Sequence, residues 1–186
     1  LCGSSGPIGQ GIARVLDREG YRLALQYKST SAAVDQLLPT LTQDRGHVAV
    51  EADFTTLKGA RGLVRDAQKA AGGRLIGVVN AAWPSGPDMS VEKSVSDERI
   101  LEASLIGYHM HAYLSGAVLP SLREAQGSLV FIGTAAATRL HPELGLIAAS
   151  KAAATVLSRV VALEEGSNGV RVNIVAPGHL DGVATG

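Results

Sequence analysis

A glycine-rich segment near the start of the chain, Gly3-Ser4-Ser5-Gly6-Pro7-Ile8-Gly9, leads directly into a helical pattern. Glycines let the backbone approach a phosphate group closely, and the first turn of a helix offers unpaired N–H donors and a partial positive charge. The segment therefore predicts a loop that binds a pyrophosphate. A glycine-rich loop is weak support by itself, and an ordinary turn is the alternative, but the helix and the strand that follow favour the phosphate loop.

The end of the next expected strand bears on which nucleotide would bind. In dinucleotide-binding folds, an acidic residue about 20 residues beyond the loop binds the ribose 2′-hydroxyl. Here the strand ends in Gln26-Tyr27-Lys28-Ser29-Thr30, which contains no acid. Lys28 and Ser29 can instead contact a 2′-phosphate, so the sequence favours NADP(H) over NAD(H). An ordinary solvated lysine is the alternative.

Short apolar runs alternate with helical patterns along the whole chain. The runs are nearly continuously hydrophobic, which is typical of strands buried on both faces of a sheet. We expect strands over residues 23–27, 47–52, 75–79, 128–132 and 170–175, and helices over residues 8–19, 31–43, 58–71, 97–122 and 148–165. This alternation predicts an α/β fold, a Rossmann-type doubly wound parallel sheet with helices on both faces. Such sheets bind ligands beyond the carboxyl ends of their strands.

Length and composition fit one globular domain over residues 1–186, and we expect this domain to be incomplete at both ends. Hydrophobic residues make up 46% of the chain, and 17 basic residues balance 17 acidic residues. No net charge therefore recruits nucleic acid or anionic lipid. We find no run of about 18 consecutive apolar residues, so we expect no membrane span. The single cysteine, Cys2, excludes an internal disulfide framework and favours a cytoplasmic protein.

Five segments keep the order and the near-matching spacing of the motifs of one family: Cys2–Gly9, Ala52–Phe54, Val79–Ala82, Ser150–Ala153 and Val170–Gly178. Together they resemble the short-chain dehydrogenase/reductase family, and the sequence pattern is most similar to its 3-oxoacyl-carrier-protein reductase type. The resemblance covers the whole chain. Pro7 replaces the middle glycine of the family's Thr-Gly-x-x-x-Gly-x-Gly, and Ala82 replaces the glycine of its Asn-Asn-Ala-Gly.

The resemblance implies a bound nicotinamide dinucleotide, with the Asp53 carboxylate at the adenine and Lys151 at the nicotinamide ribose. We expect no metal. The residues that the resemblance and the loop together assign to the cofactor are Gly3, Ser5, Ile8, Gly9, Tyr27, Lys28, Ser29, Asp53, Phe54, Asn80, Ala81, Lys151, Pro177 and Gly178.

The same resemblance shows where the chemistry departs from the family. Its members transfer hydride between the nicotinamide and a carbonyl or alcohol carbon, and a tyrosine four residues before the lysine handles the proton. Here Ile147 occupies that position and has no ionisable group. Thr134 keeps a hydroxyl at the family's serine position. Ser104, or Gly107 in a shifted alignment, stands at the asparagine of the proton relay. The implied catalytic residues are therefore Lys151, Thr134 and Ser104.

A replacement proton donor would have to come from elsewhere in the chain. The best placed candidates lie in the loops before Lys151 and after the Pro-Gly turn: Arg139, His141, Glu143, His179 and Asp181. We select His141 because its proton can move near neutral pH, although a solvated loop residue is the alternative.

Aromatic residues beyond Ser104 are less well placed, because each helical turn moves about 5.4 Å along the helix axis. We therefore interpret four of them as helix-packing or subunit-interface residues: Tyr108, His109, His111 and Tyr113. Trp83 either forms an apolar wall for a ligand or packs internally.

We predict an NADP(H)-dependent oxidoreductase with a non-standard active site, which reduces an imine or an activated C=C bond rather than a simple ketone. Two alternatives remain: a non-catalytic scaffold, and a cyclase, dehydratase or isomerase without net hydride transfer. Ile147 argues against a standard ketoreductase, whereas Asp53, Asn80 and Lys151 argue for a retained cofactor. We expect a small-molecule substrate, and the resemblance implies a homodimer or homotetramer built on the two long helices.

Overall fold

The computed structural model describes residues 1–83 and 90–180 of the chain. The strands are β1 (Ala24–Tyr27), β2 (Val48–Glu51), β3 (Gly77–Asn80), β4 (Ser128–Ile132) and β5 (Arg171–Val175). The α-helices are α1 (Pro7–Arg18), α2 (Ala32–Leu37), α3 (Leu57–Ala70), α4 (Val91–Ser94), α5 (Asp97–Ser104), α6 (Met110–Ala125) and α7 (Gly145–Glu165). Shorter helical turns are η1 (Leu38–Thr40), η2 (Gln43–Arg45), η3 (Leu105–His109), η4 (Ala135–Ala137) and η5 (Gly166–Asn168), of which η3 is a π-helix.

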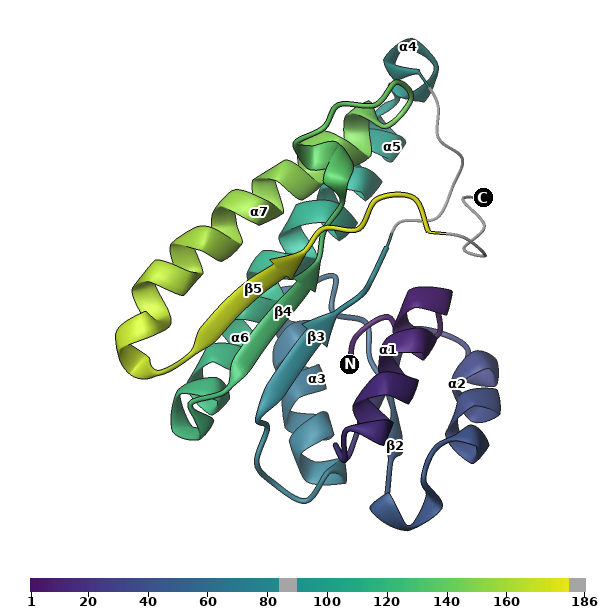
Figure 1. The fold of residues 1–186 in the computed structure, drawn as a ribbon. Helices are drawn as coiled ribbons and strands as arrows, with labels where there is room; N and C mark the ends of the chain where they lie inside the picture. The colour runs from purple at the N-terminus through teal and green to yellow at the C-terminus, as the bar shows by residue number, and fades with distance from the viewer. Residues whose placement is uncertain (84–89, 181–186) are drawn as a thin grey trace.

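The first two residues of the chain join two parallel ladders, β1–β2 and β3–β4–β5, into one sheet. The Gln26 N–H donates to the Leu1 carbonyl at 2.9 Å, and the Cys2 N–H donates to the Val79 carbonyl at 2.8 Å. The spatial order is therefore β2, β1, Leu1–Cys2, β3, β4 and β5 (Figure 1). The sequence showed no strand before the glycine loop, because two residues are too few to form a pattern.

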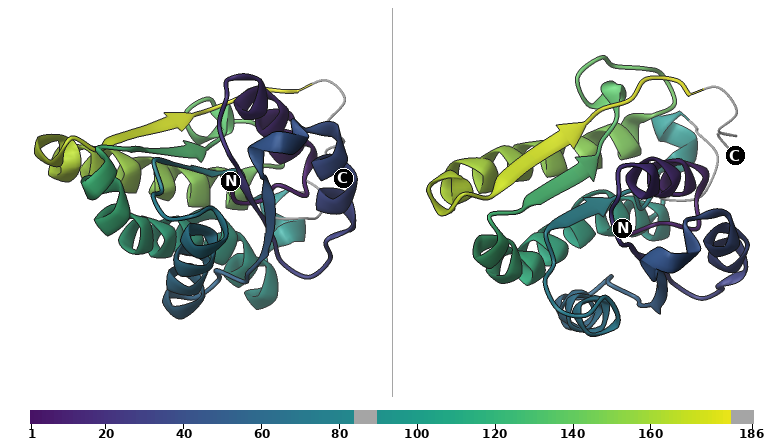
Figure 2. Two further views of the ribbon diagram at one scale, coloured as in Figure 1. Left: turned by 90° about the horizontal axis from the view of Figure 1, so that it is seen from below. Right: turned by 60° about the horizontal axis from the view of Figure 1, so that its bottom comes forward.

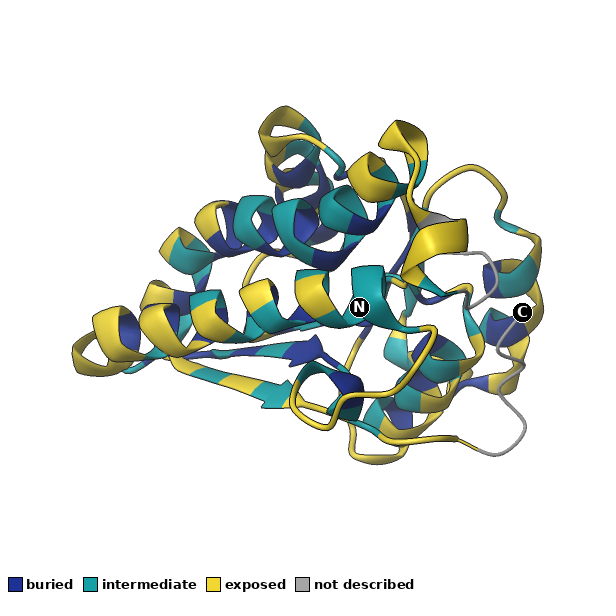
Figure 3. Ribbon diagram, turned by 90° about the horizontal axis from the view of Figure 1, so that it is seen from above, coloured by how far each residue is buried: buried dark blue, intermediate teal, exposed yellow. Residues whose placement is uncertain are grey.

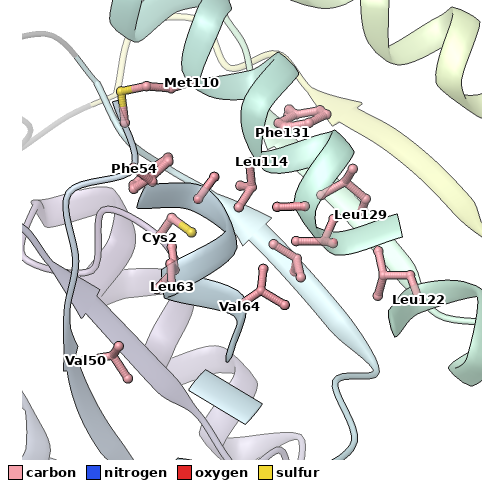
Figure 4. Close-up of a cluster of buried hydrophobic side chains, with 14 of the residues drawn as sticks. Cys2, Val50, Phe54, Leu63, Val64, Met110, Leu114, Leu122, Leu129 and Phe131 are labelled. Atoms are coloured by element: carbon pink, nitrogen blue, oxygen red, sulfur yellow. The ribbon is translucent and has the colours of Figure 1, made fainter. Parts of the chain in front are cut away.

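Helices cover both faces of this sheet, as predicted. Helices α3, α6 and α7 lie on one face, and α1 and α2 lie on the other face beside β1 (Figures 1 and 2). The larger apolar cluster fills the space between α3, α6 and strands β2 to β4, and includes Val64, Leu114 and Phe131 (Figure 4). A second cluster joins α1, α2 and β1 around Leu25 and Val34. The doubly wound α/β fold is thus confirmed.

Three of the predicted helices differ from the structure. The helix predicted over residues 97–122 is interrupted, because the π-helical turn η3 separates α5 from α6. At this turn Gly107 lies against α7, where a Cβ on residue 107 would approach the Ser150 Cβ to 2.3 Å. The helix predicted over residues 31–43 ends at Leu37, because Pro39 cannot continue an α-helix and the chain passes into 3₁₀ turns. Helix α7 begins at Gly145, three residues earlier than predicted.

Strand β5 and helix α7 expose more surface than the sequence suggests. Arg171, Asn173 and Val175 of β5 are exposed, so this strand is not buried on both faces as expected (Figure 3). Within Gly145–Asn168, an 18-residue stretch has a mean hydropathy of 1.6, so this helix could cross a membrane by length and composition alone. Only 22% of that stretch is buried, although the helix packs on β5 and buries Lys151 and Glu165.

The close crossing of η3 and α7 gives a test of the fold. Gly107→Ala is expected to lower the free energy of unfolding by about 1–3 kcal/mol, because the added methyl group must displace Ser150. Gly116→Ala is the matched control: a Cβ there meets no atom within 4 Å, so the substitution should raise stability by about 0.5–1 kcal/mol. Urea denaturation measures both. A Gly107→Ala protein as stable as the parent would contradict the crossing.

Candidate functional site

The glycine-rich loop lies against the turn that follows β3, at the carboxyl edge of the sheet (Figure 1). Gly3 has a φ of +70°, and a Cβ there would lie 2.7 Å from the Ala82 nitrogen. A Cβ on Gly9 would lie 2.2 Å from the Gly3 carbonyl oxygen. Helix α1 begins at Pro7, and its N-cap residue Gly6 makes no side-chain capping bond. The N–H groups of its first turn therefore remain available to an anion.

Gln26 holds this loop to the sheet, a role that the sequence analysis did not assign. Its buried side chain accepts a hydrogen bond from the Gly3 N–H at 2.9 Å and donates to the Ala52 carbonyl at 2.7 Å. Its main-chain carbonyl accepts from the Ser4 hydroxyl at 2.7 Å. The available signal was a polar residue inside the apolar run over residues 23–27.

Lys28 and Asp53 follow the adjacent strands β1 and β2 and form an ion pair with an N–O distance of 3.2 Å. Partial burial acts to raise the pKa of Asp53, but hydrogen bonds from Thr55 and the charge of Lys28 outweigh it and hold that pKa below its usual value. Ser29 is exposed next to Lys28. The structure therefore brings together the residues predicted at the adenosine end of the nucleotide.

Of two further residues predicted at the adenosine end, Tyr27 lies near the ion pair and Phe54 lies in the apolar core. The Tyr27 hydroxyl lies 3.5 Å from a Glu51 carboxylate oxygen, near the ion pair. Phe54 is 2% exposed and packs in the larger apolar cluster, so its backbone alone is left for a cofactor (Figure 4).

Sequence reasoning also missed Gly59, where a Cβ would approach the Asp53 carbonyl oxygen to 1.9 Å. This glycine lets α3 start directly beneath Asp53.

Lys151 lies buried at the opposite end of the site, with 1% of its surface exposed. Its ammonium donates to the Ile132 carbonyl at 3.3 Å and to the Ala82 carbonyl at 3.4 Å. It also lies 4.7 Å from the centroid of the Trp83 ring, within the range of a cation–π interaction. Desolvation lowers the pKa of Lys151 from 10.5 to about 8. Trp83 is 44% exposed, so it forms an open wall beside Lys151 rather than packing in the core.

Asn80 is the last residue of β3, and Ala81 follows it in the turn whose Ala82 carbonyl contacts Lys151. Asn80 is fully buried, and its Oδ1 accepts a hydrogen bond from the Ala82 N–H at 3.0 Å. The Ala81 N–H donates to the Cys2 carbonyl at 3.0 Å, which joins the turn to the start of the glycine loop. The turn therefore connects the two ends of the predicted cofactor site.

The three positions that the family resemblance assigns to catalysis lie on different elements. Ile147 lies one turn before Lys151 on α7, so the two side chains share one side of the helix. Thr134 follows β4, and its hydroxyl oxygen accepts from the Ala136 N–H at 3.3 Å. Ser104 is the last residue of α5, where the π-helical turn begins. A cavity of about 320 Å³ between η4, α7 and β5 is lined by Thr134 but not by Lys151.

The predicted loop residues lie on the surface. His141 is exposed, and its Nδ1 lies 2.6 Å from the Pro142 carbonyl oxygen. The Pro177 carbonyl accepts from the Ala135 N–H at 2.8 Å, which places the Pro-Gly turn beside Thr134. Gly178, like Arg139, Glu143 and His179, is not buried, and Asp181 lies outside the described residues.

The aromatic residues on η3 and α6 contact one another or the core, and the subunit-interface alternative stays a prediction. The Tyr108 and His109 rings lie 5.3 Å apart, and the His109 and Tyr113 rings 6.3 Å apart. His111 is fully buried, with its ring centroid 4.5 Å from that of Phe131.

Comparison with known proteins places this geometry among dehydrogenases and reductases. The sequence model of the family described as enoyl-(acyl carrier protein) reductase matches residues 3–186. L-fucose dehydrogenase from Oryctolagus cuniculus is 31% identical over 184 residues, which cover 97% of this chain and 61% of that protein. The 3-oxoacyl-[acyl-carrier-protein] reductase from Bos taurus is 26% identical over 181 residues, which cover 96% of this chain and 73% of that protein. The chain thus spans less than two thirds of the length of the rabbit enzyme.

Solved structures with the same fold include two dehydrogenases. An alcohol dehydrogenase from the archaeon Thermococcus sibiricus, complexed with 5-hydroxy-NADP, superposes with a TM-score of 0.88 at 26% identity, and the match covers 100% of this chain and 77% of that one. A dehydrogenase/reductase from Sinorhizobium meliloti 1021 gives a TM-score of 0.86 at 29% identity, covering 97% and 71% of the two chains.

The burial of Lys151 predicts a pH dependence of stability. Between about pH 8 and 10.5 the unfolded chain holds a proton at Lys151 that the folded protein has released, so stability rises with pH across this window. The total rise from this group is on the order of 3 kcal/mol. The control is Lys151→Met, which should lack this rise. Urea denaturation across the window measures it, and identical pH profiles for the two proteins would contradict the buried ammonium.

Proposed function

The chain belongs to the short-chain dehydrogenase/reductase family, and from this premise we propose that it is an NADP(H)-dependent oxidoreductase with a non-standard active site. The observation that carries the proposal is the buried Lys151 ammonium, which two main-chain carbonyls hold beside the open face of Trp83. Burying an ammonium without a carboxylate costs free energy, and such groups cluster at functional sites. Ile147, one turn earlier, makes the site non-standard.

The residues present fit a nicotinamide dinucleotide. Gly3 and Gly9 let the loop backbone pack closely on Ala82 and on itself, which shapes the loop at the start of α1, and the uncapped first turn of α1 suits a pyrophosphate. Asp53 would hold the adenosine, and Lys151 would hold the nicotinamide ribose. When bound, the nicotinamide supplies or accepts the hydride. The NADP analogue in the Thermococcus sibiricus alcohol dehydrogenase supports this assignment.

NADP(H) is preferred over NAD(H) in this proposal, because Lys28 and Ser29 would meet the 2′-phosphate. The Lys28 side chain is 62% exposed and its partner is the single carboxylate of Asp53, so the ammonium can turn toward a ligand at little cost.

The altered proton path determines the substrate class that we propose. The Thr134 hydroxyl would polarise the reacting bond, with Ser104 in place of the relay asparagine, but no residue of the family's type donates a proton beside Lys151. An imine or an activated C=C bond needs no enzymic donor at oxygen, and the remaining proton can come from solvent or from His141. A non-catalytic scaffold is the second candidate, which Ile147 favours, because the loss of a general acid costs about 10²–10⁴ in rate.

Self-association and location complete the proposal. Helix α7 exposes Val156, Val160 and Leu163, which are 61%, 44% and 85% exposed, along one side. Such an apolar stripe suits a second copy of the chain, so we propose a homodimer or homotetramer built on α6 and α7. The single cysteine, Cys2, favours a cytoplasmic protein, and the balanced charge favours a small-molecule ligand over nucleic acid or a membrane surface.

Ile147→Tyr tests the site directly. A tyrosine one turn before Lys151 should create reduction of a simple ketone, raising its rate by about 10²-fold or more over the parent protein. Ile147→Phe is the matched control, because it adds the ring without the hydroxyl. Oxidation of NADPH with a panel of ketones, imines and enones measures both. The parent should oxidise NADPH with an imine or an enone. If NADPH binds but no compound of the panel causes its oxidation, the scaffold is established instead.

Lys28→Ala tests the nucleotide preference. Loss of a charge-assisted hydrogen bond to the 2′-phosphate should raise the Kd for NADPH by roughly tenfold while leaving the Kd for NADH nearly unchanged. Lys69→Ala removes an equally exposed lysine from the last turn of α3 and should change neither value. Equal effects of Lys28→Ala on both nucleotides, measured by calorimetry, would argue against NADP(H) selectivity.

A further inference from the structure

His111 is a histidine in an apolar layer. It lies on the side of α6 that faces the sheet, is fully buried, and packs against Phe131 of β4 at a tilt of 32°. Desolvation lowers the pKa of His111 to about 3, the positive charge of Lys151 adds to this effect, and the Ile106 carbonyl opposes it. The ring is therefore neutral, with one N–H donor and one bare nitrogen acceptor. The Ile106 carbonyl is the acceptor near the ring N–H, although its geometry falls short of a regular hydrogen bond, and the bare nitrogen has no hydrogen-bond partner among the described residues.

Asn80 carries a second buried group of this kind. Its Oδ1 is used by the Ala82 N–H, but its Nδ2 has no hydrogen-bond partner among the described residues. Asn80 and Phe131 are register partners on β3 and β4. Paired side chains of neighbouring strands point to the same side of a sheet. The Asn80 amide and the His111 ring therefore both border Phe131 in the layer between the sheet and α6.

These two residues connect to Lys151 through the main chain. Asn80 fixes the turn that presents the Ala82 carbonyl, which accepts from the Lys151 ammonium. The second acceptor of that ammonium, the Ile132 carbonyl, follows Phe131 directly in β4. Whatever holds the Asn80 amide therefore also holds one side of the lysine site. A buried donor and a buried acceptor that border the same ring complement one another, because each otherwise loses its hydrogen bond to water.

We propose that His111 is a positioning residue, whose bare ring nitrogen accepts a hydrogen bond from the Asn80 amide, directly or through one internal water, and so fixes the turn that holds Lys151. The inference rests on the proposed function only in that it assigns His111 to the nucleotide site. It gives a reason for a histidine where an apolar side chain would pack equally well against Phe131.

The test compares His111→Leu with His111→Gln. Leucine keeps the packing but accepts no hydrogen bond, whereas the glutamine carbonyl can accept one from Asn80. In His111→Leu, NMR should show the side-chain amide protons of Asn80 exchanging with solvent at least about tenfold faster, and the Kd for NADPH should rise by about tenfold. His111→Gln should restore both values toward those of the parent.

A purely structural role for His111 predicts the opposite result. His111→Leu would then fold with unchanged Asn80 exchange and unchanged NADPH affinity, and this outcome would overturn the inference. If neither the parent nor either variant binds NADPH, the proposed function fails. The exchange rate of the Asn80 side-chain amide protons still decides whether His111 holds the turn.

Discussion

The ammonium of Lys151 is the group on which the arrangement of the site depends. It is removed from water, and removing a charge from water costs several kcal/mol unless other groups replace its hydration. Its replacements are two carbonyl dipoles and the face of Trp83, and among the described residues no carboxylate forms an ion pair with it. These groups belong to the end of β4, the turn after β3 and the start of α7. Lys151 can be buried in this way because the three segments meet at one point.

Close backbone approaches bring these segments together. The contact of Gly107 with Ser150 brings η3 against α7, and the contact of Gly3 with the Ala81–Ala82 backbone brings the phosphate loop against the turn after β3. Between the loop and that turn, Cys2 hydrogen bonds to both Val79 and Ala81. The glycine loop and the lysine end of the candidate site are therefore joined along one edge of the sheet, where we propose that a dinucleotide binds.

The sequence predicts the framework better than the details. Strand β4 matches its predicted bounds because Gly127 and Gly133 flank its apolar run. The π-helical turn η3 was not predicted, since its cause is a contact with α7 that no local pattern records. The exposure of β5 is also a tertiary property, because an apolar run is the same whether one or both of its faces are covered.

The site residues also divide into those that a local sequence motif predicts and those that only tertiary contacts reveal. Asp53 and Lys151 were predicted from family motifs with recognisable spacing and Lys28 from its place at a strand end, and the missing tyrosine is visible only because a family motif defines where it would stand. Gln26 was not assigned to the site, because its hydrogen-bond partners are distant in sequence. His111 was set aside because it lies about two helical turns beyond Ser104, where the sequence places it away from the site. Their roles become apparent only from the orientation of their polar atoms.

Trp83 provides the most direct test of the central claim that Lys151 marks a nicotinamide nucleotide site. It is the sole tryptophan of the chain, and its ring lies against the Lys151 ammonium, so its fluorescence reports on this site alone. The measurement is the titration of Trp83 emission with NADPH, corrected for absorption with a free tryptophan derivative. The account predicts saturable quenching that weakens strongly in Lys151→Met. Emission that does not change up to millimolar NADPH would contradict it.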